Sequence, residues 1–213
     1  MPAGLIVTSN SGTIQIDSSF STPTLEQSGN IFAVNPVTTP PSGANFITTS
    51  KPGSMLFVGN TSGRYVSVIR EILSGGTTKY SFVSWPEGNV NYYLYSEFPD
   101  ISSGAGYGLQ VFKEDGSLSF DSSRKLLLIQ DILPVSGAGL TSHSLPSGNY
   151  AALIATQSFA ARRASPSNTQ LITLGVRVDS NAVHTDIIPL SPAALPISEE
   201  RALIGSDLFV IRP

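Results

Sequence analysis

The stretch YGLQVFKEDGSLSFDSS, residues 107–123, decides the fold, because it reads as a compact β-hairpin and a second version of it opens the chain. The stretch AGLIVTSNSGTIQIDSS, residues 3–19, aligns with it without a gap at an offset of 104 residues. Seven positions are identical: Gly4, Leu5, Val7, Gly12, Asp17, Ser18 and Ser19 match Gly108, Leu109, Val111, Gly116, Asp121, Ser122 and Ser123. Since the offset is close to half of the 213 residues, the sequence predicts an internal duplication.

The spacing of the apolar residues predicts how each hairpin pairs. In the first copy, the apolar positions lie two apart on each strand and therefore share one face: Leu5 with Val7, and Ile14 with Ile16. For all four to face one core, residue 7 has to pair with 14 and residue 5 with 16, which leaves a four-residue loop ending in a glycine. The second copy requires the same loop at residues 113–116. We expect Asp17 and Asp121 to begin the turn out of each hairpin through Asx-type hydrogen bonds.

Short runs rich in β-branched and aromatic residues predict strands along the rest of the chain. The runs are residues 55–60, 65–73, 79–85, 91–98, 149–157, 169–180, 182–190 and 207–213, and residues 31–34 and 46–48 are two short apolar runs in a segment rich in turn residues. Residues 125–133 fit either a buried strand or a short helix, and residues 198–205 fit a single helical turn. The sequence therefore predicts an all-β fold of two tandem β-sandwich-like domains with little helix: residues 1–99, a junction at 100–106, and residues 107–213.

Composition excludes several classes of partner. Charged residues make up 13% of the chain, about half of the ~25% that is usual, and the net charge is −3 without a dense basic cluster. Nucleic acid is therefore not an expected partner. The chain has no cysteine, and its first residues lack the basic region and apolar run of a signal peptide. No apolar segment approaches the ~20 residues of a membrane span, so we expect a protein made in the cytoplasm without membrane insertion.

Candidate catalytic and metal-binding residues are few. The two histidines, His143 and His184, could bind a metal only if the fold brought them to a carboxylate such as Asp186, and exposed polar residues in loops are the simpler interpretation. No nucleophile elbow is present, and no pair of acids is singled out for glycoside hydrolysis. The acids considered are Glu87, Glu97, Asp100, Asp179 and Asp186. We therefore expect neither an enzyme nor a metal or cofactor site.

Aromatic residues cluster just before and within residues 91–98. The cluster comprises Trp85, Tyr92, Tyr93 and Tyr95. On a strand, Tyr92 faces the side opposite to Tyr93 and Tyr95. An exposed aromatic face would suit glycan or protein binding, because such rings offer a large contact area with a polar tip. The alternative is that these rings pack in the core and in a domain interface.

The second hairpin resembles a motif of small tail proteins of bacteriophages and prophages. The residues that carry the resemblance are Gly108, Leu109, Gln110, Val111, Phe112, Gly116, Phe120, Asp121 and Ser122. It covers about 17 residues in the second copy and, more weakly, the equivalent 17 in the first. The resemblance implies a virion component at the tail tip, baseplate or fibre, and it brings no catalytic residues with it.

Three functions are consistent with this sequence. The first is a structural adaptor of the phage tail that docks neighbouring tail or fibre proteins, as a symmetric homo-oligomer or in a hetero-assembly. The second is a receptor- or carbohydrate-binding module of the tail that contacts a host glycan, and the third is a capsid decoration or neck protein. In each case the expected location is the virion, after assembly in the host cytoplasm.

Overall fold

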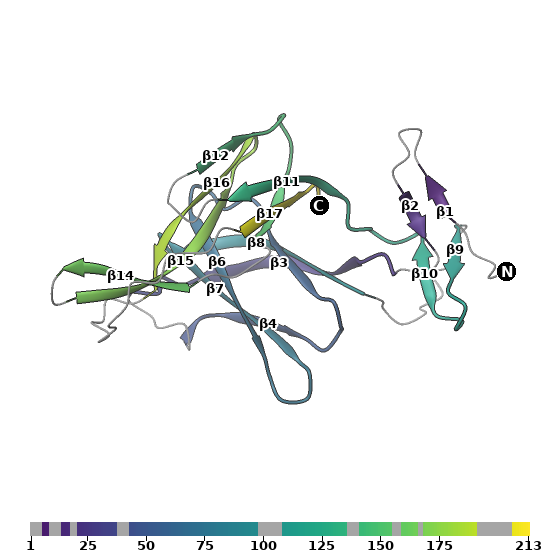
Figure 1. The fold of residues 1–213 in the computed structure, drawn as a ribbon, viewed down its shortest axis with the longest axis horizontal. Helices are drawn as coiled ribbons and strands as arrows, with labels where there is room; N and C mark the ends of the chain where they lie inside the picture. Colours follow the sequence, from purple (N-terminus) through teal and green to yellow (C-terminus); the bar gives the residue numbers. More distant parts are fainter. Residues whose placement is uncertain are drawn as a thin grey trace. The chain divides into compact units, whose positions relative to one another are not determined.

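The computed structural model of the chain describes residues 6–8, 14–17, 21–37, 43–97, 108–135, 141–154, 159–165, 168–190 and 206–213 (Figure 1). Regular structure in these residues is almost entirely β-strand, which confirms the all-β prediction. The chain forms two compact units. Unit 1 comprises Met1–Gln27, Lys51–Met55 and Leu94–Leu127, and unit 2 comprises Ser28–Ser50, Leu56–Tyr93 and Leu128–Pro213.

Unit 1 contains both hairpins, and the two hairpins have the same register. The first pairs β1 (Ile6–Thr8) with β2 (Ile14–Asp17), and the second pairs β9 (Gln110–Phe112) with β10 (Leu118–Asp121). Val7 lies opposite Ile16, and the equivalent Val111 lies opposite Phe120. The register shifts at the same place in both copies, between the central and the loop-side pair. The predicted pairing of residue 7 with 14 was therefore wrong by the same shift in both hairpins.

The turn of the second hairpin explains this shift. The Lys113 N–H donates to the Ser117 carbonyl at 2.7 Å, and the Gly116 N–H donates to the Lys113 carbonyl at 3.0 Å, so the loop has three residues instead of four. Gly116 adopts φ = +80°, which is typical of a turn that continues into a bulge. The β-bulge that follows brings three apolar side chains of the motif to the buried side, Val111, Leu118 and Phe120, while Leu109 remains 49% exposed.

The segments that follow the two hairpins pair with each other. The Leu25 N–H donates to the Lys125 carbonyl and the Leu127 N–H donates to the Pro23 carbonyl, both at 2.8 Å. These bonds enclose an antiparallel bridge between Thr24 and Leu126. Both copies of the motif therefore belong to one structural unit.

Two large sheets, which lie mainly in unit 2, form the sandwich. The six-stranded sheet has the order β11 (Ile129–Val135), β17 (Ser206–Ile211), β13 (Ala151–Ile154), β5 (Met55–Val58), β8 (Gly88–Ser96) and β3 (Thr24–Ala33). The seven-stranded sheet has the order β12 (Thr141–Ser144), β16 (Ala182–Pro189), β15 (Asn168–Val178), β6 (Tyr65–Ile72), β7 (Thr78–Trp85) and β4 (Phe46–Thr49), and β14 (Phe159–Ser165) pairs with β15. Alternating apolar residues supply the core, in which the Phe82 ring of β7 meets the Tyr92 ring of β8 at a centroid distance of 5.8 Å.

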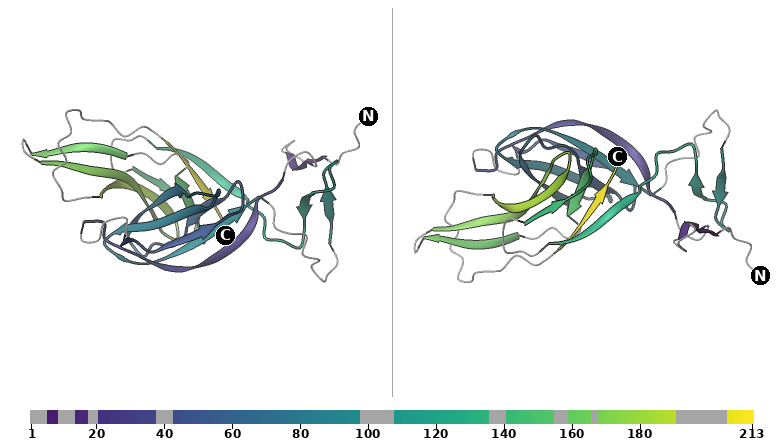
Figure 2. Two further views of the ribbon diagram at one scale, coloured as in Figure 1. Left: turned by 90° about the horizontal axis from the view of Figure 1, so that it is seen from below. Right: turned by 90° about the horizontal axis from the view of Figure 1, so that it is seen from above.

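The two halves of the chain contribute the same arrangement of strands. The first half supplies β5-β8-β3 to one sheet and β6-β7-β4 to the other, and the second half supplies β13-β17-β11 and β15-β16-β12 in the equivalent places. Figure 2 shows these halves, coloured purple to blue and green to yellow, on opposite sides of unit 2. Among the described strands only β14 has no counterpart. This correspondence is the arrangement that an internal duplication produces.

The division of the structure differs from the expected domains at 1–99 and 107–213. The halves join within both sheets, where Val58 lies opposite Ala152 and Val66 lies opposite Val176. All four side chains are buried, so separate domains would expose two apolar strand edges. Of the two alternatives for residues 125–133, the strand is present as β11, although it is largely exposed. The junction at 100–106 and the helical turn at 198–205 lie outside the described residues.

Candidate binding surfaces

The four aromatic residues singled out in the sequence do not form one exposed surface. Tyr92 and Tyr95 are buried, and Tyr93 is half-buried. Trp85 is 45% exposed at the end of β7. The alternative of core packing therefore describes Tyr92 and Tyr95, and Trp85 is the member of the cluster that a ligand can reach most fully.

Hydrogen bonds hold the turn that carries Trp85. The Ser84 hydroxyl lies 2.9 Å from the Pro86 carbonyl, which spans the tryptophan. The Arg64 Nε donates to the Glu87 carbonyl at 3.0 Å, from the turn that precedes β6. The backbone on both sides of Trp85 is thus fixed, which lowers the entropy lost when a ligand binds to its side chain.

A polar cluster lies beside Trp85 on the seven-stranded sheet. Tyr65 is the cross-strand neighbour of Trp85, and the Arg177 guanidinium lies 5.2 Å from the centre of the Tyr65 ring. The Asp179 Oδ2 lies 3.2 Å from Arg177 Nε and 3.1 Å from His184 Nε2. We call Tyr65, Trp85, Arg177, Asp179 and His184 the Trp85 cluster.

The charges of the Trp85 cluster largely compensate one another. Burial raises the pKa of the Tyr65 phenol, Arg177 lowers it, and Asp186 and Asp179 raise it, with a net upward shift from 10.0. The phenol therefore stays protonated at neutral pH and can donate a hydrogen bond. Aromatic faces beside paired polar groups suit a ligand that is rich in hydroxyl groups.

The structure does not bring the two histidines together. His143 lies on β12 opposite Val183, and Ser142 is the residue opposite His184, so the two imidazoles are on opposite faces of the sheet. Both residues lie on strands, not in the loops expected from the sequence. In the described part of the chain, no group of three His, Cys, Asp or Glu residues could hold a metal ion.

The five acids singled out in the sequence do not converge on one site either. Glu87 and Glu97 are exposed, and Asp100 lies outside the described residues. Asp179 pairs with Arg177 and His184 of the Trp85 cluster, and the Asp186 carboxylate accepts the Ile187 backbone N–H at 2.7 Å. The described acids are therefore accounted for by surface exposure and local pairing.

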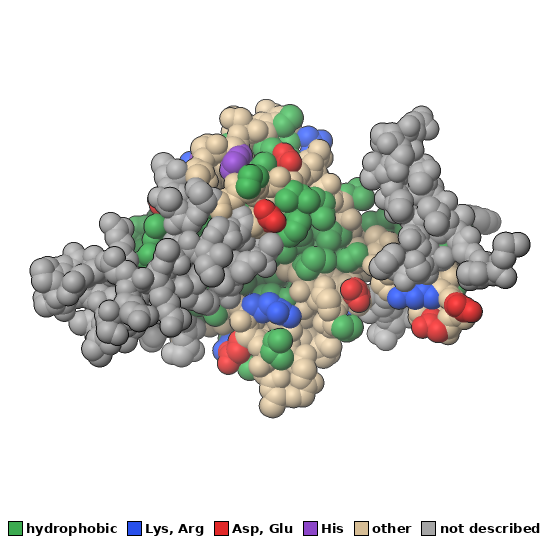
Figure 3. Space-filling view, viewed as in Figure 1, with side chains coloured by type: hydrophobic (Ala, Val, Ile, Leu, Met, Phe, Trp, Pro, Cys, Tyr) green, Lys and Arg blue, Asp and Glu red, His purple; other side chains and the backbone are tan. Residues whose placement is uncertain are grey.

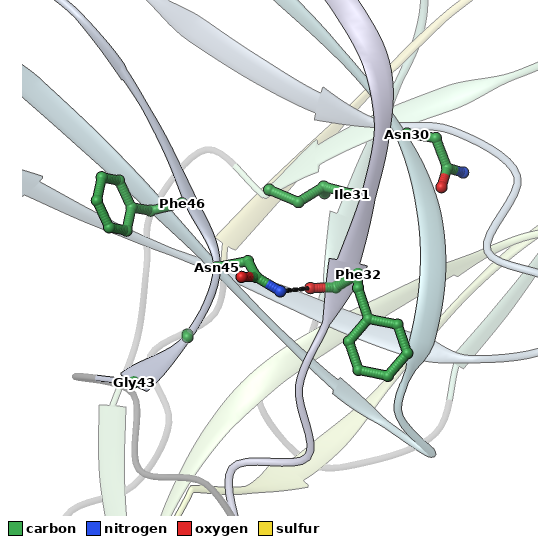
Figure 4. A pocket seen from close by; sticks show the side chains of 7 residues that line it. Asn30, Ile31, Phe32, Gly43, Asn45 and Phe46 are labelled. Atoms are coloured by element: carbon green, nitrogen blue, oxygen red, sulfur yellow. Dashed lines mark hydrogen bonds between the residues drawn. The ribbon is translucent and has the colours of Figure 1, made fainter.

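A groove of about 550 Å³ opens between β3 and β4 (Figure 4). Its lining consists of Asn30, Ile31, Phe32, Gly43, Ala44, Asn45 and Phe46. Figure 4 shows Ile31 and Asn45 in the space between the two strands, with Phe32 and Phe46 at its two sides. The Asn45 side chain bridges the groove by donating from Nδ2 to the Phe32 carbonyl at 2.8 Å.

The groove was not identified from the sequence. Residues 31–34 and 46–48 were recognised only as short apolar runs. Phe32 and Phe46 are 42% and 54% exposed, so neither ring belongs to the core. Their exposure depends on which strands form the edges of the two sheets. That choice is made by long-range pairing, which the local pattern does not encode.

A third surface lies on β11 and is apolar. Leu128, just before β11, is 67% exposed, and Ile129 and Ile132 of β11, at the edge of the six-stranded sheet, are 51% and 52% exposed. Figure 3 shows hydrophobic side chains gathered over β11 and β17 near the C-terminus. We call Leu128, Ile129 and Ile132 the β11 patch.

The chain matches no known protein-family model, no curated protein and no solved structure. In the described residues, no helix is long and apolar enough to cross a membrane.

Proposed function

We propose that the protein is a non-enzymatic structural component of a bacteriophage tail, at the tail tip or baseplate, where it docks neighbouring tail or fibre proteins. The observation that carries this proposal is the β11 patch. Single exposed apolar residues are ordinary on protein surfaces, whereas a group of them close together marks an interaction site. Covering the three side chains by a partner removes apolar area from water, at roughly 25 cal/mol per Å².

The residues of the second hairpin that carry the resemblance to tail proteins have structural roles in it. The Leu109 N–H donates to the Ser122 Oγ at 2.8 Å, and a Cβ at Gly108 would lie only 2.9 Å from the same oxygen. Asp121 begins the turn out of the hairpin by accepting the Ser123 N–H at 2.9 Å, as the sequence predicted. The residues of the motif therefore have structural roles, which suits a building block of an assembled particle.

Immunogold labelling of the particles tests the proposal. Antibodies raised against the purified chain are expected to label the tail tip, with few copies on each virion. A charge introduced by Ile132→Asp is expected to reduce incorporation, and Ile72→Asp, at a side chain 65% exposed at the end of β6 (Tyr65–Ile72), serves as the matched surface control. Label along the head would indicate a decoration protein, and unlabelled particles would overturn the proposal.

A carbohydrate- or receptor-binding module is the second candidate, and the Trp85 cluster favours it. Its partly exposed indole lies on a turn fixed by hydrogen bonds, beside a protonated phenol and the network of Arg177, Asp179 and His184. Proteins bind sugars with a similar mixture of ring faces and polar groups. On a glycan array, Trp85→Ala should abolish binding, and Phe46→Ala should leave it unchanged. Absence of glycan binding by the intact chain would remove this candidate.

A further inference from the structure

We propose that the groove between β3 and β4 binds an extended segment of a partner protein, which adds as a strand to the edge of β3. This inference rests on the adaptor function and names the chemistry of one of its docking sites. Addition of a strand to a sheet edge is a common way to bind a peptide, because backbone hydrogen bonds supply affinity and side-chain pockets supply specificity.

Each of the two large sheets ends at this groove. Among the described strands, β3 is the last of the six-stranded sheet, and β4 is the last of the seven-stranded sheet. An edge strand presents backbone N–H and carbonyl groups that have no partner within the sheet. The groove is therefore bordered by hydrogen-bonding backbone on both sides.

One contact shows which backbone groups face the groove. The Phe32 carbonyl is directed to the Asn45 side chain, away from the sheet of β3. Residues two apart on a strand direct their backbone groups to the same side, so the N–H and carbonyl of Asn30 also face outward. On the other side, the Asn45 carbonyl accepts the Phe82 N–H of β7 at 3.0 Å, so the backbone groups of Phe46 are the ones that face outward.

The equivalent edge in the second half of the chain is blocked. β11 occupies the place of β3, and its Ile132 N–H donates to the Asp131 carboxylate at 2.8 Å. Pro134, two residues further, has no N–H to offer, and the register of β11 shifts between Ile129 and Asp131. A local carboxylate, a proline and a bulge are devices that prevent strand addition. Residues 28–32 of β3, Ser-Gly-Asn-Ile-Phe, contain no charge and no proline.

The lining of the groove indicates the chemistry of the segment. No lining residue is charged, and the ring of Phe46 is accompanied by Lys79 Nζ at 4.8 Å outside the lining. The Asn45 amide donates one hydrogen bond, to the Phe32 carbonyl, and so retains an oxygen and a second N–H for the backbone of the segment, whereas the Asn30 amide is directed to Asn91 Oδ1. The best occupant is an extended, uncharged segment with apolar side chains at alternate positions.

Selection from a library of random seven-residue peptides, displayed on beads, tests the inference with the whole chain. We expect enriched peptides that are uncharged and alternate in hydrophobicity. Asn30→Pro removes one outward N–H and is expected to weaken the enriched peptide at least tenfold. Asn30→Ala removes the same side chain but keeps the N–H, and it should bind within about twofold of the wild type. Backbone amides of Asn30, Phe32 and Phe46 should gain protection from hydrogen exchange in the wild-type complex, a measurement that needs no variant.

Several results would overturn the inference. Equal losses in the two Asn30 variants would show that the side chain, not the backbone, binds the peptide. A library without enriched peptides, together with saccharide binding that Phe32→Ala abolishes, would assign the groove to a sugar. Tail labelling without peptide binding would overturn this inference alone, whereas peptide binding by a chain absent from the particles would overturn the adaptor function alone.

Discussion

The carboxylate of Asp121 accepts hydrogen bonds from both the backbone N–H and the hydroxyl of Ser123, at 2.9 and 2.6 Å. Gln110 Nε2 donates to the other carboxylate oxygen at 3.0 Å, and Arg124 Nε lies 3.5 Å from it. The bond from the Ser123 hydroxyl is the largest cause that lowers the pKa of Asp121, to about 2, against the opposing effect of burial. The ionised carboxylate of Asp121 therefore stabilises the second hairpin.

The stability of unit 1 should fall in acid. The pKa of Asp121 is lower in the folded chain (about 2) than its ordinary 3.8, so the folded state binds fewer protons and the stabilisation is present above about pH 4. It is lost as the pH falls from about 4 through about 2. Hydrogen exchange of the Ser123 amide across this range measures the loss. Asp121→Asn should flatten most of the dependence and leave a smaller one from Asp115, whose pKa is lowered by the Ser117 hydroxyl. An unchanged profile in Asp121→Asn would contradict the assignment.

Removing the Asp121 side chain should destabilise unit 1 at neutral pH. Asp121→Ala leaves the donors of Ser123 and Gln110 without their acceptor, at a cost of roughly 2 kcal/mol or more. Urea unfolding followed by hydrogen exchange in unit 1 checks this value. Asp131→Ala, an exposed acid that also accepts a backbone N–H, provides the control and should cost less than about 1 kcal/mol.

Gly175 should tolerate no side chain unless its neighbour is shortened. A Cβ at Gly175 would lie 2.1 Å from Ile188 Cδ1 and 3.3 Å from Tyr65 Cβ, on a buried part of β15. Gly175→Ala is expected to cost about 1–3 kcal/mol by overpacking. The double variant Gly175→Ala, Ile188→Ala should lose less free energy of unfolding than the sum of the single changes. Strict additivity in chemical denaturation would show that the contact is relieved elsewhere.

The core of the sandwich should depend on Phe82 and not on Phe46. Phe82 is fully buried against Tyr92, whereas Phe46 is 54% exposed. Phe82→Ala is expected to lower the free energy of unfolding by about 3–5 kcal/mol, and Phe46→Ala by about 0.5 kcal/mol or less. Equal losses in the two variants would mean that the buried contact does not hold the sheets together.

Unblocking β11 should cause self-association. The double variant Asp131→Ala, Pro134→Ala restores two outward N–H groups beside the β11 patch. We expect a shift to higher oligomers in sedimentation velocity at concentrations where the wild type is unchanged. Asp186→Ala, which removes the same kind of carboxylate–N–H bond from β16, serves as the control. A monomeric double variant would show that the edge is protected by something else.

The sequence predicted the elements that local pattern encodes. Both hairpins, most of the strands and the duplication follow from alternation, turn residues and the 104-residue offset. The register predicted from the four apolar positions was wrong, because their alternation does not encode the β-bulge beside the loop. The left-handed conformation of Gly116 and the bulge after it set the register of the second hairpin.

The sequence did not predict which distant strands pair with each other. Val58 and Val66 alternate as any buried strand does, and nothing local indicates that their partners are Ala152 and Val176. The exposure of Trp85 and the burial of Tyr92 follow from the same pairing. The sequence therefore identified the aromatic cluster, but not which of its rings are exposed. The groove at β3 and β4 depends on which strands lie last in each sheet, and for that reason it was missed.

The joining of the halves through β5–β13 and β6–β15 has a consequence for synthesis on the ribosome. When β5 and β6 emerge, their partner strands are still about a hundred codons away, which corresponds to on the order of ten seconds of translation. During that interval the nascent first half carries two apolar edges without their partners. Folding is therefore completed only when the second half has been made, and each newly made chain needs protection from its neighbours on the polysome until then.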